Sequence, residues 1–225
     1  MSKRKVGVIH TFLYSVEDLK ALFAEMLPEV EMVNIIDDSL LKEVLANTGT
    51  TPGVVKRICQ YAVLLESLGC ECILNQCSSV GEAADVAAKL ISIPYVKVDK
   101  PMGAIAIQEA LKGGGKVGVV ATAISTVAPS TRLVETTARE MGADVTVSSC
   151  FAKGAYEALL EEGDKPKHDR ILMETIQKAV DENDAVVLAQ GSMMSLLEKT
   201  KDMGKPVVCS FRTGVKQIRD VLGLD

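Results

Sequence analysis

Short runs of β-branched and other apolar residues alternate along the chain with longer segments in which apolar residues recur at helical spacing. The short runs predict strands at 5–10, 31–36, 72–75, 95–98, 117–121, 144–148, 185–189 and 207–209. The longer segments predict helices at roughly 16–27, 39–47, 52–68, 80–91, 101–112, 126–141, 153–162, 167–182, 192–203 and 213–222. Strands that are almost continuously apolar and alternate with helices are typical of parallel sheets covered on both faces. We therefore expect an α/β fold.

Residues with known preferences for helix ends support these assignments. Thr51 precedes Pro52, which is the order of an N-cap followed by proline in the first turn, and Gly69 lies just beyond the helix that they open. Ser79 and Glu82 have the spacing of a capping box for the next helix.

The two halves of the sequence resemble each other. Each half contains an uncharged strand, turn and helix start, at 73–79 in the first half and 187–193 in the second. The separation of these segments is about the length of one small domain rather than of a solenoid repeat. We expect two pseudo-symmetric lobes, one formed by residues 1–99 and 210–225 and the other by residues 100–209, with the joint near 99–102.

Composition limits the kinds of partner and of chemistry. The 25 Lys and Arg against 30 Asp and Glu give a net charge of −5, which argues against nucleic acid and anionic membranes as partners. No uncharged stretch reaches the ~18 apolar residues of a membrane span, and residues 3–16 lack the features of a signal peptide. We therefore expect a cytoplasmic protein, in which the six Cys are free thiols. With only two His, thiols are the first candidates for catalysis.

Several motifs with known functions are absent or incomplete. No G-x-G-x-x-G follows a predicted strand, and Val117 stands where the glycine-rich segment 112–116 would need Ser or Thr to form a phosphate-binding loop. Cys70 and Cys72 do not have zinc-ligand spacing, so we expect no metal. His168 lies in a charged segment, which predicts a solvent-exposed start of a helix.

Cys77 is the strongest candidate for a reactive group. It follows a predicted parallel strand and directly precedes a helix start, where the helix dipole and free N–H groups favour a thiolate. Polar residues flank it on both sides: Asn75, Gln76, Ser78 and Ser79. The alternative is an inert buried cysteine, because free cysteine is among the most buried residue types.

The ends of the first, second, fifth and seventh predicted strands are also polar, and none of these four carries Lys or Arg. His10 and Thr11 end the first strand, and Asp37, Asp38 and Ser39 end the second. Hydroxyls and helix-start N–H groups follow later strands at Thr122, Ser125, Thr126, Gln190, Gly191 and Ser192. Such neutral donors suit a small anion, although ordinary helix capping uses the same residues.

The chain resembles the aspartate/glutamate racemase superfamily, which includes hydantoin racemases, maleate isomerases and arylmalonate decarboxylases. The resemblance extends over most of the chain and is strongest at 34–40, 74–79, 117–122 and 186–193. It implies that two lobes enclose a small carboxylate substrate in the cleft between them. It also implies that two cysteines act without a cofactor, one taking a proton and the other returning it, and that the protein is a homodimer or higher homo-oligomer.

Only one of the two family cysteines has a counterpart here. Cys77 matches the first, whereas the second falls on Gln190 or on Gly191, depending on the alignment. The remaining possibilities are a one-base isomerase, an isomerase in which Cys77 pairs with a non-thiol group such as His10, and covalent catalysis by Cys77. Cys150 and Cys209, near other predicted strand ends, are less favoured substitutes.

The sequence therefore predicts a cofactor-independent racemase or isomerase that acts beside a carboxylate or carbonyl, with Cys77 as acid/base. The expected substrate-binding residues are Asn75, Ser78, Ser79, Thr122, Ser125, Thr126 and Ser192. A decarboxylase-like lyase also needs only one acid, but its single cysteine resembles the second-lobe position. The third alternative is a protein that binds a small acid without converting it.

Overall fold

The computed structural model describes residues 3–224, except for the side chains of Tyr14 and Ser15. Its strands are β1 (Arg4–His10), β2 (Val30–Ile36), β3 (Cys72–Asn75), β4 (Tyr95–Lys97), β5 (Lys116–Ala121), β6 (Thr146–Phe151), β7 (Ala185–Leu188) and β8 (Val207–Cys209). The α-helices are α1 (Tyr14–Met26), α2 (Ser39–Ala46), α3 (Pro52–Ser67), α4 (Gly81–Ala87), α5 (Lys100–Ala110), α6 (Ile124–Met141), α7 (Ala155–Leu160), α8 (Lys165–Glu182) and α9 (Ser210–Leu222). Two 3-10 helices, η1 (Ser78–Val80) and η2 (Gly191–Thr200), follow β3 and β7.

The strands form two four-stranded parallel sheets with the same topology. The strand order is β2-β1-β3-β4 in the first sheet and β6-β5-β7-β8 in the second. The α/β fold with two pseudo-symmetric parallel sheets is therefore confirmed. Because all strands of a sheet run in one direction, the polar residues that follow them gather at one edge, which we call its carboxyl edge.

The chain divides into two compact units. Unit 1 comprises the chain up to Val98 and again from Phe211, and unit 2 comprises Asp99–Ser210. The sequence-based division at 99/100 and 209/210 differs from these boundaries by one residue on each side.

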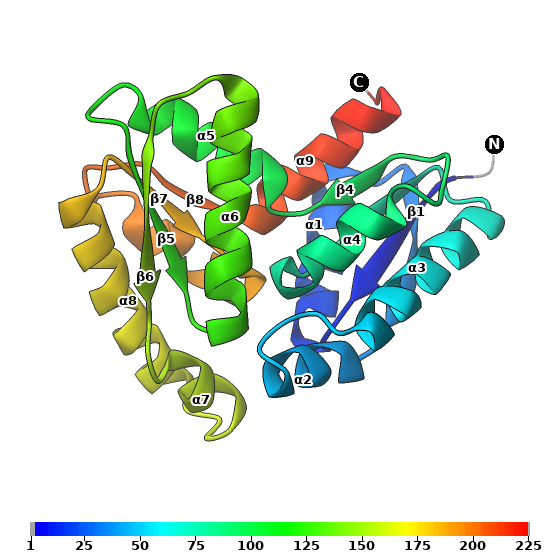
Figure 1. Ribbon diagram of the computed structural model, residues 1–225, viewed down its shortest axis with the longest axis horizontal. Coiled ribbons are helices and arrows are strands. Elements are labelled where there is room, and N and C mark those ends of the chain that lie inside the picture. Colours follow the sequence, from blue (N-terminus) through cyan, green and yellow to red (C-terminus); the bar gives the residue numbers. More distant parts are fainter. Residues whose placement is uncertain (1–2, 225) are drawn as a thin grey trace. The chain divides into compact units, whose positions relative to one another are not determined.

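In unit 1, helices α3 and α4 lie on the viewer's side of β1 (Figure 1). The core on this side joins Ile9 and Ile73 of the sheet to buried side chains of α2, α3 and α4. Helix α9 lies beside α1: Arg212 forms an ion pair with Glu25, and Arg219 Nη1 donates a hydrogen bond of 2.6 Å to the carbonyl of Met26.

In unit 2, apolar clusters cover both faces of the sheet. One cluster packs α5 and α6 against Val117, Val119 and Val187. The other packs α7, α8 and η2 against Val120, Val186 and Leu188. Alternate residues of β5 thus point to opposite faces, as the pleat of a strand requires.

Three local predictions were wrong. The strand expected at 144–148 is β6, which begins two residues later and extends to Phe151. The helix expected at 80–91 ends at Ala87, and its N-cap is Val80 rather than Ser79, because residues 78–80 already form a 3-10 turn. The segment expected as a helix at 192–203 is the 3-10 helix η2. Among the residues described, no helix is both long and apolar enough to span a membrane.

Candidate active site

Cys77 lies at the carboxyl edge of the sheet of unit 1. It is two residues beyond the end of β3, has an extended backbone and forms the N-cap of η1. Its side chain is 8% exposed and belongs to the apolar cluster of Ile9 and Ile73. Asn75 Nδ2 donates a hydrogen bond of 2.9 Å to the carbonyl oxygen of Cys77, which fixes the turn that carries the thiol. Ser78 and Ser79, both buried, follow in η1.

Four buried polar atoms at the same edge have no hydrogen-bond partner within the described part of the chain. They are His10 Nδ1, Thr11 Oγ1, Asn75 Oδ1 and Gln76 Oε1. Each of these residues is at most 3% exposed. Burying a polar group without a partner is costly, and clusters of such groups are uncommon in native proteins. These atoms are therefore candidates for contact with a ligand.

The hydrogen bonding of His10 fixes which of its nitrogens carries a proton. His10 Nε2 lies 2.9 Å from Asn34 Oδ1, which accepts hydrogen bonds only, so Nε2 carries the proton and Nδ1 has a lone pair. Burial lowers the pKa of His10 and a nearby Lys20 lowers it further, while the Asn34 hydrogen bond raises it. The neutral imidazole is thus an acceptor at Nδ1. Because strand residues alternate, His10 points to the face opposite Ile9, whose face Cys77 shares.

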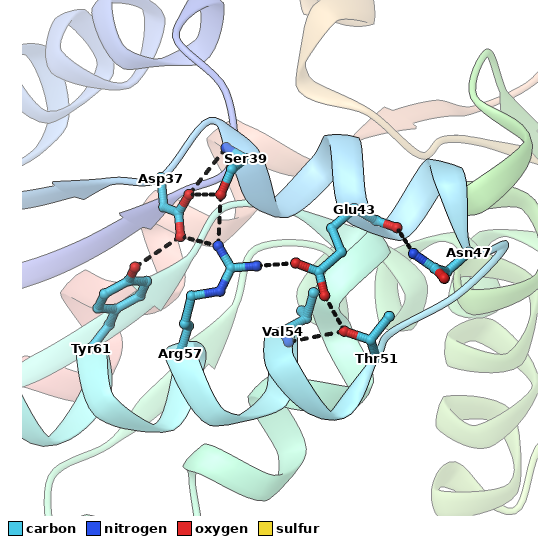
Figure 2. Close-up of polar contacts among 8 residues, drawn as sticks. All are labelled: Asp37, Ser39, Glu43, Asn47, Thr51, Val54, Arg57 and Tyr61. Atoms are coloured by element: carbon cyan, nitrogen blue, oxygen red, sulfur yellow. Dashed lines mark hydrogen bonds and ion pairs between the residues drawn. The ribbon is translucent and has the colours of Figure 1, made fainter.

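A network of ion pairs and hydrogen bonds joins α2 and α3 to the residue that follows β2 (Figure 2). Arg57 Nη1 on α3 donates hydrogen bonds of 2.8 Å to Asp37 Oδ2, directly after β2, and of 2.6 Å to Ser39 Oγ. Its Nη2 pairs with Glu43 of α2, and Tyr61 OH donates to Asp37 Oδ2 at 2.8 Å. The pKa of Asp37 is below its usual value: burial alone would raise it, but hydrogen bonds from Ser39 and Tyr61 and the charge of Arg57 lower it.

The helices joined by this network provide much of the apolar environment of Cys77. Leu40 and Val44 of α2, together with Val54 and Ile58 of α3, are fully buried in the cluster that contains the thiol. The N-terminal cap of α3 is as predicted: Thr51 Oγ1 accepts a hydrogen bond of 3.2 Å from the amide of Val54. The charged network therefore stabilises the packing on one side of Cys77.

In unit 2 the side chain of Gln190 binds the start of α6. Its Oε1 accepts three hydrogen bonds, from the Thr122 amide at 2.6 Å, the Thr122 hydroxyl at 3.0 Å and the Ala123 amide at 3.2 Å. Thr122 and Ala123 are each 2% exposed, whereas Gln190 is half-buried. The sequence predicts that the Thr122 hydroxyl and nearby helix-start N–H groups bind an anion. In the structure these groups donate to the side-chain oxygen of Gln190.

Gln190 occupies in unit 2 the position that Cys77 occupies in unit 1. Each residue lies two positions beyond the last residue of the third strand in its sheet order, has an extended backbone and is the N-cap of a 3-10 helix. Of the two positions left open by alignment, Gln190 rather than Gly191 is therefore the structural counterpart of Cys77. Gly191 begins η2 and is buried.

The other predicted binding residues of unit 2 also lie at the carboxyl edge of its sheet. Ser125 and Thr126 are buried in the first turn of α6, and Ser192 is half-buried at the start of η2. Asn75, Ser78 and Ser79 are brought together with Cys77 in unit 1, and Thr122, Ser125 and Thr126 with Gln190 in unit 2.

The remaining cysteines differ in burial. Cys70, Cys72 and Cys209 are buried, while Cys59 and Cys150 are partly exposed. Cys150 is the penultimate residue of β6, near the strand end as expected, and burial raises the pKa of its thiol. Cys59 packs against the apolar cluster that contains Cys77 without being fully buried.

Two polar features differ from what their sequence context indicates. His168, expected at a solvent-exposed helix start, is 1% exposed in the first turns of α8. The glycine-rich turn after α5 is held by a carboxylate: Asp184 Oδ2 accepts hydrogen bonds of 2.9 Å from the Gly114 amide and 3.0 Å from the Lys116 amide. The charged neighbours of His168 gave no sign of its burial, because a single helical side chain can point inward from a polar segment.

The chain thus forms two α/β units with parallel sheets, each with buried hydroxyls and amides at the carboxyl edge of its sheet, and unit 1 carries a thiol at that edge. A model of the Asp/Glu/Hydantoin racemase family matches residues 13–218, so the chain belongs to that family. This membership places the chain among racemase-type isomerases. No curated protein sequence matches the chain closely enough to serve as a relative.

Solved structures of racemases have the same fold. Glutamate racemase isoform RacE1 from Bacillus anthracis superposes with a TM-score of 0.72 at 17% identity, covering 99% of this chain and 83% of the other. Allantoin racemase from Klebsiella pneumoniae gives 0.68 at 18% identity, with 99% and 89% coverage. Aspartate racemase from Picrophilus torridus gives 0.65 at 17% identity, with 98% and 94% coverage. At such low identities the similarity establishes the fold.

Proposed function

We propose that the protein is a cofactor-independent racemase or isomerase that removes and returns a proton at a carbon beside a carboxylate or carbonyl, with Cys77 as an acid/base. The observation that carries the proposal is the group of buried, unpartnered polar atoms at the carboxyl edge of unit 1, where Cys77 also lies. Open α/β sheets bind their ligands at this edge.

The same atoms favour one kind of substrate. His10 Nδ1, Asn75 Oδ1 and Gln76 Oε1 are acceptors, and Thr11 Oγ1 can accept as well as donate. Acceptors without a donor are suited to a ligand that carries N–H groups. An amino acid, or a cyclic or open-chain amide of one, supplies them, whereas a plain dicarboxylate does not.

The proposed role of Cys77 follows from its position at a helix start. Backbone N–H groups at the beginning of a helix stabilise a thiolate, which is the form that accepts a proton. Removing a proton beside a carboxylate produces an enediolate, and preorganised donors lower its energy by ~3–4 kcal/mol each. Ser78, Ser79 and the backbone amides after Cys77 are donors of this kind in unit 1.

A second candidate is a decarboxylase-like lyase, in which loss of carbon dioxide generates the carbanion and one thiol suffices to protonate it. It is favoured because Gln190, and not a cysteine, occupies the position in unit 2 that corresponds to Cys77. Unit 2 therefore offers no thiol at that position. Release of carbon dioxide from substituted malonates distinguishes this activity from isomerisation.

The test is deuterium exchange in deuterium oxide, followed by NMR and chiral chromatography over a panel of amino acids, their amide derivatives, hydroxy acids and dicarboxylates. We expect exchange for a substrate that carries N–H groups, and a loss of at least 100-fold in Cys77→Ala, which lies within the usual contribution of a general acid/base. The matched control is Cys59→Ala, since Cys59 is a partly buried thiol of the same unit at the periphery of the same cluster. Exchange that persists in Cys77→Ala, or that fails equally in Cys59→Ala, would refute the role of Cys77.

A further inference from the structure

Strand β6 is an edge of the sheet of unit 2, and its outer side has no strand partner among the residues described. Edge strands are usually protected from further pairing by short length, charged side chains, proline or a bulge. The other edge of this sheet, β8, has three residues; in unit 1, β4 is equally short and β2 contains Glu31. β6 has six residues, none of them charged or proline, and its register with β5 is unbroken. It therefore lacks these protections.

The alternation of the backbone determines which groups of β6 point outward. The Thr146 amide donates to the Gly115 carbonyl at 2.8 Å, and the Ala152 amide donates to the Ala121 carbonyl at 2.9 Å. The N–H and C=O groups of the even-numbered residues thus face β5. The residues whose N–H and C=O groups point away from the sheet are Val147, Ser149 and Phe151. Within the described part of the chain, only the Phe151 carbonyl among these groups has a hydrogen-bond partner, the Lys153 amide at 3.0 Å.

A groove of about 370 Å³ lies beside this edge, between β6 and α8. Residues 149–151 line one side of it, and Glu174, Lys178 and Glu182 of α8 line the other. Ser149 is exposed and Phe151 is 37% exposed. The described part of unit 2 therefore leaves both the outer backbone groups of β6 and the adjoining groove accessible.

The sequence of β6 matches a second copy of itself. In an antiparallel pair centred on Ser149, the two copies of Ser149 lie opposite each other and exchange two hydrogen bonds. Val147 of each copy then lies opposite the partner's Phe151, so all the outward groups of the strand are paired. Such aromatic and β-branched cross-strand pairs are favourable. An axis centred on Ser148 or on Cys150 would leave one outward residue of each copy without a β6 residue opposite it.

The charges on α8 fit the same arrangement. Ser148 Oγ donates a hydrogen bond of 3.0 Å to Asn183 Oδ1, which places the end of α8 level with Ser148. Because α8 runs antiparallel to β6, the helical rise places Lys178 about 4 Å beyond Ser149, towards the carboxyl end of β6. The two-fold operation places the partner's Glu182 about 2 Å beyond Ser149 on the same side. Opposite charges are therefore nearly level with each other where the two grooves join.

We propose that β6 is a self-association edge, at which two copies of the chain pair antiparallel about Ser149 and the sheets of their units 2 become continuous. Each chain has one β6, so the contact closes on itself and gives a dimer rather than a filament. The inference is independent of the proposed function, because none of these residues takes part in it.

The first test is the mass of the full-length protein, measured by sedimentation equilibrium over a concentration series. We expect the wild type to reach twice the mass of one chain. Ser149→Lys places two like charges opposite each other at the axis and should raise the dissociation constant of the dimer about tenfold or more. The matched control is Ser149→Thr, which keeps an uncharged side chain suited to a strand and should leave the constant within about threefold.

The second test is cross-linking by oxidation in a Cys150→Ser background, which determines the register. Ser149→Cys should give a disulfide-linked dimer, because the Cα atoms of a hydrogen-bonded antiparallel pair are ~5.5 Å apart, within the range of disulfides. Thr146→Cys is exposed on the same strand. Its two copies are separated by six residues in this register, about 20 Å, so it should not cross-link.

Three outcomes overturn the inference. A wild type that stays monomeric at every concentration leaves the edge to a segment of some other protein. A dimer of undiminished affinity in Ser149→Lys uses another surface. Cross-linking of Thr146→Cys as efficient as that of Ser149→Cys excludes the register centred on Ser149. The cross-linking test does not use the lysine variant, so it decides the matter even if Ser149→Lys fails to fold.

Discussion

Replacing Gln190 with methionine tests the structural role of its carboxamide. Gln190→Met keeps the length and flexibility of the side chain but removes the oxygen that accepts from the Thr122 amide, the Thr122 hydroxyl and the Ala123 amide. A buried donor left without a partner costs ~1–3 kcal/mol, and water beside the half-buried Gln190 recovers part of that cost. We expect a net local destabilisation of about 2 kcal/mol, equivalent to ~30-fold in an equilibrium constant.

The assay is native-state hydrogen exchange of the Thr122 and Ala123 amides, read residue by residue by NMR. Protection of both amides should fall ~30-fold in Gln190→Met, while amides in the sheet of unit 1 keep theirs. Gln190→Glu is the matched control, because its carboxylate accepts the same three hydrogen bonds. A change of less than threefold at both amides in Gln190→Met would refute the reasoning.

Three further predictions concern stability and reactivity. Gly214→Ala should lower the free energy of unfolding by about 1–3 kcal/mol in urea titrations, because its Cβ would lie 2.9 Å from the Val98 carbonyl oxygen. The control is Gly81→Ala, whose Cβ would meet nothing within 4 Å and which should not lower the free energy of unfolding. Burial lowers the pKa of His10 from 6.5, so the unfolded chain binds the proton more tightly and stability falls as the pH drops from 6.5 towards the folded pKa. An NMR titration of His10 with a midpoint at or above 6.5 contradicts this. Burial raises the pKa of Cys72 to about 12, so iodoacetamide at pH 8 should alkylate Cys72 only after denaturation, as mass spectrometry can determine.

The sequence was sufficient for the features that depend on local pattern. An apolar run followed by Asn75, Gln76 and Cys77 predicts a buried strand that ends in a polar turn, and the structure has both. The cap at Thr51 and Pro52 is likewise local, because the hydroxyl bonds an amide three residues later. Such features need no knowledge of distant contacts.

Features that depend on tertiary packing were not accessible from the sequence. Ser79 has the spacing of a helix cap, but the 3-10 turn that follows Cys77 shifts the helix start beyond it. His168 lies among charged residues, yet its inward direction is set by the packing of α7 and α8 on the sheet. The three hydrogen bonds of Gln190 join residues 67 or 68 positions apart, and no local pattern indicates them.

The discontinuity of unit 1 has a consequence for biosynthesis. Unit 2 is one continuous segment, whereas α9, with Phe211, Val215 and Ile218 fully buried, is translated after it. Domains generally fold as units while the ribosome is still adding residues. The unit that contains Cys77 therefore begins to emerge first but is completed last, and until α9 arrives its apolar surface is available to chaperones.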